Sequence, residues 1–245
     1  MRVSPRPLVP VASEWADFQG VIPIDLRQME SIFPGFNAAA EITLTVPVAP
    51  LLGHMQFSEL AVLIAVVRTL GASSFAEIGT FDGLTVLNLL ENCPQLQKIY
   101  TVDLPEDVLS AKGTGSVFPI DSINASMLHT VRIGARFANH PLRGKVVQLR
   151  EDSANLTERD FPTSPEVFLI DGAHTWEYCL SDSRLAQKVT ADSSVLVWHD
   201  YANVKYLPGV TEVLQGLARE QELRLYWLDS PPLRTSLVFG IRDAA

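Results

Sequence analysis

Acidic side chains stand at or near the ends of five short apolar stretches in this 245-residue sequence. They are Glu77, Asp103, Asp152, Asp171 and Asp200, the last preceded by His199. A carboxylate beside apolar residues is costly unless it is solvated, paired or bound to a cation. Ligands of an open parallel sheet bind beyond the carboxyl ends of its strands, so we interpret the set as one polar ligand site rather than chance loop placement.

Asp171 and Asp200 are 29 positions apart, yet both end predicted strands that are neighbours. Two oxygen ligands with waters suit Mg²⁺, which takes one or two protein carboxylates. His199 is a softer, borderline ligand, and Asn203 is a further candidate if its loop turns inward. Asp171, His199 and Asp200 are therefore the metal-site candidates. Mg²⁺, another divalent metal and no metal all stay open.

His174 follows Asp171 by three residues, where a helix is predicted to begin. An ordinary histidine pKa near 6.5 suits the removal of a hydroxyl proton at neutral pH. The alternative is a capping or packing histidine, but two convergent acids nearby favour a general base. His54, His129 and His140 lack such neighbours, and we expect them to be surface or structural residues.

Residues 75–83, Phe-Ala-Glu-Ile-Gly-Thr-Phe-Asp-Gly, run from an apolar stretch into a glycine turn, and a helical pattern follows at once. Glycine accepts positive φ and lets a ligand approach the backbone, and a helix start offers free N–H groups. Phe81 stands where a dinucleotide fingerprint requires its second glycine, and we expect Asp82 to repel a pyrophosphate. The turn favours a nucleoside cofactor without a phosphate.

Asp103 lies 24 positions after Gly79, at the end of the next predicted strand. A carboxylate there can accept both hydroxyls of a ribose. This spacing fits NAD or another adenosine cofactor, and only the glycine turn separates the two.

Continuous apolar runs alternate with helical patterns along the chain. Strands are predicted at 75–79, 98–103, 146–150, 167–170, 194–198, 225–228 and 236–241, and helices at 57–70, with Ser58 as N-cap, 83–92, 123–139, 175–189 and 208–217. Such alternation predicts a mostly parallel sheet covered on both faces. The fold class is therefore α/β, a Rossmann-like seven-stranded sheet with an antiparallel last strand.

Residues 1–55 are rich in proline and show no sustained period, yet they are too apolar for a floppy tail. We expect them to pack on the main domain or on a partner subunit, as a substrate lid or the arm of a homo-oligomer. Residues 56–245 then form the cofactor-binding domain, in which 104–122 reads as a long loop.

The formal charge of −9 leaves no basic footprint for nucleic acid. Cys93 and Cys179 are far apart and are expected to be reduced, structural thiols. No apolar run approaches the ~18 residues of a membrane span, and the N-terminus lacks the apolar core of a signal peptide. We expect a cytoplasmic protein with a small-molecule partner, no nucleic acid and no membrane.

The stretch Glu-Ile-Gly-Thr-Phe-Asp-Gly-Leu-Thr at 77–85 resembles motif I of class I S-adenosylmethionine-dependent methyltransferases. Its Glu-x-Gly-x-x-x-Gly form is similar to that of metal-dependent small-molecule O-methyltransferases of the catechol and caffeoyl-CoA type. Phe-Leu-Ile-Asp-Gly-Ala-His-Thr-Trp-Glu-Tyr at 168–178 and Val-Trp-His-Asp-Tyr at 197–201 are similar to methyltransferase family 24. The resemblance covers roughly residues 55–242.

The resemblance implies S-adenosyl-L-methionine as cofactor and a role for each matched position. Glu77, Gly79, Thr80, Phe81 and Gly83 would surround its methionine part, Asp103 would hold the ribose, Leu104, Asp152 and Ser153 would lie near the adenine, and Asp171 and His174 would face methyl transfer. The metal-dependent relatives supply Asp, then Asp-Asn or Glu-Asp, so His199-Asp200 departs from both patterns.

The sequence therefore predicts a methyltransferase that acts on a small-molecule hydroxyl, on a sugar or a natural product, with or without a metal. A catalytically inactive cofactor-binding protein is the first alternative, because His199 replaces an expected acid. An NAD-dependent oxidoreductase is the second, and the broken glycine fingerprint disfavours it. Nothing in the sequence identifies the methyl acceptor.

Overall fold

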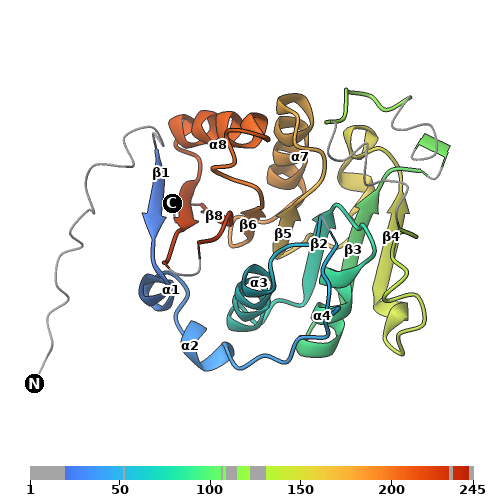
Figure 1. Cartoon of the computed structure of the whole chain (residues 1–245), viewed down its shortest axis with the longest axis horizontal. Coiled ribbons are helices and arrows are strands. Elements are labelled where there is room, and N and C mark those ends of the chain that lie inside the picture. Colours follow the sequence, from blue (N-terminus) through green and yellow to red (C-terminus); the bar gives the residue numbers. More distant parts are fainter. Residues whose placement is uncertain are drawn as a thin grey trace, which may run out of the picture.

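One mixed sheet carries the fold, with helices packed on both of its faces (Figure 1). The computed structural model describes residues 20–51, 53–105, 107–108, 115–121, 131–231 and 234–242. Its elements in chain order are β1 (Val21–Ile24), α1 (Leu26–Ile32), α2 (Phe36–Ala39), α3 (Phe57–Thr69), β2 (Ser74–Ile78), α4 (Leu84–Asn92), β3 (Lys98–Asp103), β4 (Val146–Arg150), β5 (Val167–Ile170), α7 (Trp176–Val189), β6 (Val195–Trp198), α8 (Pro208–Glu220), β7 (Arg224–Leu228) and β8 (Val238–Ile241), with 3-10 turns at Arg143–Lys145, Ser153–Asn155 and Glu158–Asp160.

The strand order is β1-β7-β8-β6-β5-β2-β3-β4. The strands from β6 to β4 run parallel to one another, and β8 runs antiparallel to both β6 and β7. The chain leaves β2 toward β3 and β4 and then returns to β5 on the other side of β2. The order therefore reverses between β2 and β5, and the crevice above such a reversal is where open α/β sheets bind ligands.

Alternate residues of each central strand enter two different cores. In β5, Val167 and Leu169 pack in the cluster that holds the buried faces of α3 and α4, whereas Phe168 and Ile170 pack with α7 and α8. Because both faces of the strand are covered, it reads as a continuous apolar run in the sequence. This confirms the predicted sheet covered on both faces and the antiparallel last strand.

The described residues form eight strands, so the predicted count of seven is wrong. The extra strand is β1, which lies in the proline-rich segment and pairs in parallel with β7 along its whole length. Pro23 interrupts these four residues and Ile22 is 45% exposed, so no continuous apolar run marks the strand. Its edge position tolerates the proline, and the pairing with β7 decides its conformation.

Two local predictions are wrong for identifiable reasons. Gln56, not Ser58, is the N-cap of α3, and its N–H donates to Glu59 at 3.0 Å. Of the predicted helix 123–139, residues 123–130 lie outside the described residues, and 131–139 hold turns instead. There Gly134, with φ of +70°, donates its N–H to the Phe81 carbonyl, so this stretch packs onto the glycine turn.

Within the described residues, no helix has the length and apolar character needed to cross a membrane. Cys93 and Cys179 are free and buried. Burial raises the pKa of the Cys93 thiol to about 12, which keeps it protonated and unreactive.

One carboxyl group of α7, that of Asp182, is buried in the protein core. Asp182 has no exposed surface, and neither of its carboxylate oxygens makes a hydrogen bond within the described residues. Burial raises the pKa of Asp182 to about 7, Ser153 opposes this shift and the charge of Asp152 adds to it. A carboxyl whose pKa is raised in the fold opposes folding once it must ionise, so this cost grows between pH 4 and pH 7 and is absent below that range.

We expect Asp182→Asn to stabilise the protein more at high pH than at low pH. From the shift to about 7, the gain in free energy of unfolding at pH 8 should exceed the gain at pH 5.5 by about 2 kcal/mol. Urea unfolding at both pH values measures it. Asp192→Asn, at a carboxylate that is 99% exposed, is the matched control and should show no such difference. Equal gains for Asp182→Asn at both pH values would contradict the prediction.

Candidate functional site

A cavity of about 730 Å³ lies beyond the carboxyl ends of the parallel strands, over the reversal between β2 and β5. Most of the predicted site residues line it, namely Gly79, Phe81, Asp103, Leu104, Ser153, Asp171, His174, His199 and Asp200. Glu77, Thr80, Gly83 and Asp152 are not among the lining residues. The topology thus brings residues from 79 to 200 into one space.

The two glycines of the turn are required by packing against protein atoms. Gly79 has φ of +103°, and a Cβ there would lie 2.0 Å from the carbonyl oxygen of Asp171. Gly83 has φ of +88°, and a Cβ there would lie 2.5 Å from the Phe137 ring. Gly79 therefore lets β2 and β5 meet above the sheet, and Gly83 lets α4 start against the 131–139 turns.

Asp82 does not present an unpaired charge to the turn. It is buried, and its Oδ2 accepts hydrogen bonds from Arg136 Nε at 2.5 Å and from the His54 ring at 2.9 Å. The expected repulsion of a pyrophosphate by Asp82 is therefore offset by its partners. The steric argument from Phe81 stands, because this residue lines the cavity at φ of +47°.

Asp103 is fixed at the mouth of the turn. Its two carboxylate oxygens accept hydrogen bonds from the N–H groups of Phe81 and Leu104, each at 2.9 Å. Burial raises the pKa of Asp103 to about 6, while those N–H groups and the charge of Arg150 act in the opposite direction. A carboxylate oxygen has two acceptor sites, so these bonds leave capacity for ligand hydroxyls.

Glu77 lies behind the turn and is fully buried. One carboxylate oxygen accepts a hydrogen bond from Thr101 at 2.6 Å, and the other makes no hydrogen bond within the described residues. Burial raises the pKa of Glu77 well above its usual range, Thr101 opposes this, and the charges of Asp171 and Asp103 add to it. A cation bound in the cavity would favour the charged form of Glu77 and so lower this pKa.

Asp152 acts within the protein rather than at the cavity surface. It accepts hydrogen bonds from the Tyr178 hydroxyl at 2.7 Å and from the N–H groups of Val117 and Ala154 at 2.8 and 3.0 Å. Its neighbours Glu151 and Ser153 line the cavity instead. The predicted place of Asp152 near the adenine stays a prediction, since Asp152 is not among the lining residues.

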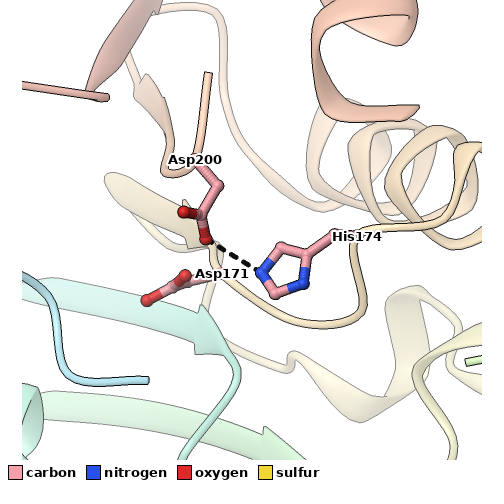
Figure 2. Close-up of side chains that lie close together, drawn as sticks. All are labelled: Asp171, His174 and Asp200. Atoms are coloured by element: carbon pink, nitrogen blue, oxygen red, sulfur yellow. Dashed lines mark ion pairs between the residues drawn. The ribbon is translucent and has the colours of Figure 1, made fainter. Parts of the chain in front are cut away.

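His174 points into the cavity between two carboxylates. Its Nδ1 lies 3.1 Å from Asp121 Oδ2. Its Nε2 lies 2.9 Å from Asp200 Oδ2 (Figure 2). Burial lowers the pKa of His174, but hydrogen bonds and charges from Asp121 and Asp200 outweigh it and raise the pKa to about 10. In this arrangement the imidazole keeps its proton at neutral pH.

His199 sits among three carboxylates. Its Nδ1 lies 3.1 Å from Asp171 Oδ1 and 3.0 Å from Asp200 Oδ2, and its Nε2 lies 3.0 Å from Glu59 Oε2. Burial opposes the charged ring, but the aspartates raise the pKa of His199 well above its usual range. Burial raises the pKa of Asp171, whereas both histidines hold the pKa of Asp200 well below its usual range against the effect of burial.

The three side chains in Figure 2 converge on one point from two strand ends and the start of α7. Ligand atoms of Asp171, His174 and Asp200 all lie within 4.8 Å of one another, a spacing that fits a metal ion. This group shares Asp171 and Asp200 with the predicted set and has His174 as its third member. His199, the third member of the predicted set, lies with Nδ1 against the aspartates and Nε2 toward Glu59. Which of these residues bind a metal stays a prediction.

Two residues of the site were missed in the sequence. Glu59 and Asp121 bond His199 and His174 from segments remote in sequence, and no local pattern marks them. His54, expected to be a surface or structural residue, has a side chain that is only 2% exposed and pairs with Asp82, and it also lines the cavity. The one available signal for Glu59 was its place as the third residue of α3 after the N-cap Gln56. The wrong choice of Ser58 as N-cap concealed this position.

A family model described as a methyltransferase domain, methyltransferase family 24, matches residues 76–201, more than half of the chain. The chain belongs to this methyltransferase family. The matched part of the methyltransferase holds the glycine turn, Asp103, Asp171, His174 and Asp200, whereas Glu59 lies before it. A search of the curated proteins found no match.

The methyltransferase also resembles solved structures. The O-methyltransferase TomG from Streptomyces achromogenes, in complex with S-adenosylmethionine, is 13% identical, with 89% of this chain and 95% of that chain covered and a TM-score of 0.54. A methyltransferase from Podospora anserina with bound S-adenosylhomocysteine is 11% identical, with 91% of this chain and 99% of that chain covered and a TM-score of 0.55. A TDP-rhamnose 3′-O-methyltransferase of calicheamicin biosynthesis is 13% identical, with 78% of this chain and 81% of that chain covered and a TM-score of 0.51. At these identities the likeness shows the fold alone.

We expect Gly79→Ala to lower the free energy of unfolding by more than about 2 kcal/mol. The new Cβ would lie 2.0 Å from a backbone oxygen, in a residue with φ of +103°. Urea unfolding followed by circular dichroism measures the change. Gly216→Ala in α8 is the matched control, since nothing lies within 4 Å of its Cβ position, and it should stabilise by up to about 1 kcal/mol. Similar effects of the two substitutions would refute the packing role of Gly79.

Proposed function

We propose that this methyltransferase transfers the methyl group of S-adenosylmethionine to a hydroxyl of a small molecule, a sugar or a natural product. The observation that carries the proposal is that Asp103 lines the same cavity of about 730 Å³ as Asp171, His174 and Asp200. One end of the cavity thus suits a nucleoside, and the other end suits a hydroxyl that must lose its proton.

The donor end fits S-adenosylmethionine residue by residue. Asp103 would accept the ribose hydroxyls, Leu104 and Ser153 would lie against the adenine, and Gly79 with the Asp171 backbone would hold the methionine part. When bound, the cofactor supplies a methyl group on a positively charged sulfonium. These roles are those that the family resemblance implies, and the residues named all line the cavity.

The charge of the cavity supports a cationic donor. Its described lining holds six carboxylates, those of Glu59, Asp103, Glu151, Asp171, Asp200 and Asp229. They outnumber the positive groups, which are the guanidinium of Arg234 and the rings of His174 and His199, whose pKa values are raised. Such a lining attracts a sulfonium and disfavours the pyrophosphate of a dinucleotide. The oxidoreductase alternative is therefore not favoured.

At the acceptor end we propose that Asp171, Asp200 and His174 hold a divalent cation. Asp121 fixes His174 through Nδ1, so Nε2 faces the two aspartates. A carboxylate behind a histidine is the usual support of a metal-binding imidazole. The nitrogen ligand favours a transition ion over Mg²⁺. The cation would lower the pKa of the acceptor hydroxyl, while the protein orients that oxygen toward the methyl group.

The N-terminal segment supports a lid role more than an oligomer arm. Gly53, His54 and Gln56 line the cavity, so residues just before α3 form part of its wall. His54 also contacts the Phe81 ring edge-on at a centroid distance of 5.6 Å. Residues 1–19 lie outside the described residues.

We expect Asp103→Asn to weaken binding of S-adenosylhomocysteine by roughly tenfold or more, because a charged acceptor for two ribose hydroxyls is lost. Isothermal titration calorimetry of the wild-type and variant chains measures it. NADH serves as the second ligand and should bind neither chain. Binding of NADH by the wild type without binding of S-adenosylhomocysteine would overturn the proposed function.

We expect the wild-type chain to bind Mn²⁺, and Asp200→Asn to weaken that binding by about tenfold or more. Electron paramagnetic resonance of free Mn²⁺ gives both affinities. Asp229→Asn changes another cavity carboxylate outside the convergent group and should leave the affinity unchanged. A wild type that binds no Mn²⁺ would overturn the cation proposal.

A further inference from the structure

Glu59 connects the first turn of α3 to the acceptor end of the cavity. It is fully buried. It lies before residues 76–201, which the family model matches. Its Oε2 lies 3.0 Å from His199 Nε2, and its Oε1 accepts hydrogen bonds from the Ser236 N–H at 2.6 Å and the Ser236 hydroxyl at 3.0 Å. One carboxylate therefore binds two different segments of the site.

Each of these two segments leads to an aspartate. Across its ring, His199 places Nδ1 at 3.1 Å from Asp171 Oδ1 and 3.0 Å from Asp200 Oδ2. The Ser236 hydroxyl accepts the N–H of Asp200 at 3.1 Å. Asp200 needs this support because it holds φ of +63°, a left-handed conformation that is costly for a residue with a side chain.

We propose that Glu59 is a positioning residue, which fixes Asp171 and Asp200 through His199 and fixes the Asp200 backbone through Ser236. This inference rests on the proposed function for the use of the two aspartates, but the network itself stands on the contacts alone. It also accounts for His199, which stands where metal-dependent relatives are expected to have an acid. The buried carboxylate is supplied from α3 instead.

The competing explanation is that Glu59 only caps α3, since its Oε2 also accepts the Gln56 N–H at 3.0 Å. Glutamine serves this capping position as well as glutamate. It has only one oxygen, however, and its NH₂ group donates. In Glu59→Gln that NH₂ must face either the donor N–H of Ser236 or the His199 and Gln56 side. With the NH₂ toward Ser236, the oxygen still accepts the Gln56 N–H, so the cap is kept and the bonds from Ser236 are lost. With the NH₂ toward Gln56 that bond is lost instead, so either orientation disturbs the network.

The test compares Glu59→Gln with Glu166→Gln in the full chain. Glu166 is a matched control because its carboxylate also accepts backbone N–H groups, from Ser73 at 2.5 Å and Ser74 at 3.0 Å, but it does not line the cavity. Three quantities are measured: the affinity for Mn²⁺, the affinity for S-adenosylhomocysteine, and the histidine side-chain ¹⁵N shifts by NMR, with His199 assigned by His199→Gln.

We expect Glu59→Gln to weaken Mn²⁺ binding about tenfold or more, to shift the His199 ring nitrogens, and to leave S-adenosylhomocysteine affinity unchanged. Glu166→Gln should change none of these. Unchanged His199 shifts in Glu59→Gln would overturn the inference, whatever the metal result. If the wild type binds no Mn²⁺, the cation proposal fails, and the His199 shifts alone still decide the role of Glu59.

Discussion

The contact between Gly79 and the Asp171 carbonyl sets the geometry of the site. A Cβ at Gly79 would lie 2.0 Å from that oxygen, so the two strand ends meet with no space for a side chain. Gly79 begins the turn that carries Phe81, and Asp171 begins the segment that carries His174. One backbone contact at the reversal of strand order therefore couples the donor end of the cavity to the acceptor end.

A second constraint is that many carboxylates share one edge of the sheet. Most of them are satisfied within the protein: Asp82 by Arg136 and His54, Asp103 by backbone N–H groups, and Asp200 by two histidines. Among the described residues, Glu77 Oε2 is a buried exception behind the donor end. A carboxylate oxygen without a partner is costly in a core. A cation bound in the neighbouring cavity would reduce this cost for Glu77.

The sequence predicted the core strands well and the edges of the fold poorly. β3, β4 and β5 match their predicted bounds, because strands buried on both faces leave continuous apolar runs. β1 leaves no such run, since an edge strand with Pro23 takes its conformation from its pairing with β7. The turns at 131–139 were read as a helix, because only contact with the Phe81 carbonyl reveals the role of Gly134.

The site residues that are close in sequence could be predicted, whereas those that come from remote segments could not. The donor end is built from one turn and the next strand end, so spacing alone pointed to Gly79 and Asp103. The acceptor end depends on pairs such as Glu59 with His199, which are 140 residues apart. Glu59 brings a buried carboxylate from α3 to within 3.0 Å of His199 Nε2, and this contact is visible only when both segments are folded together.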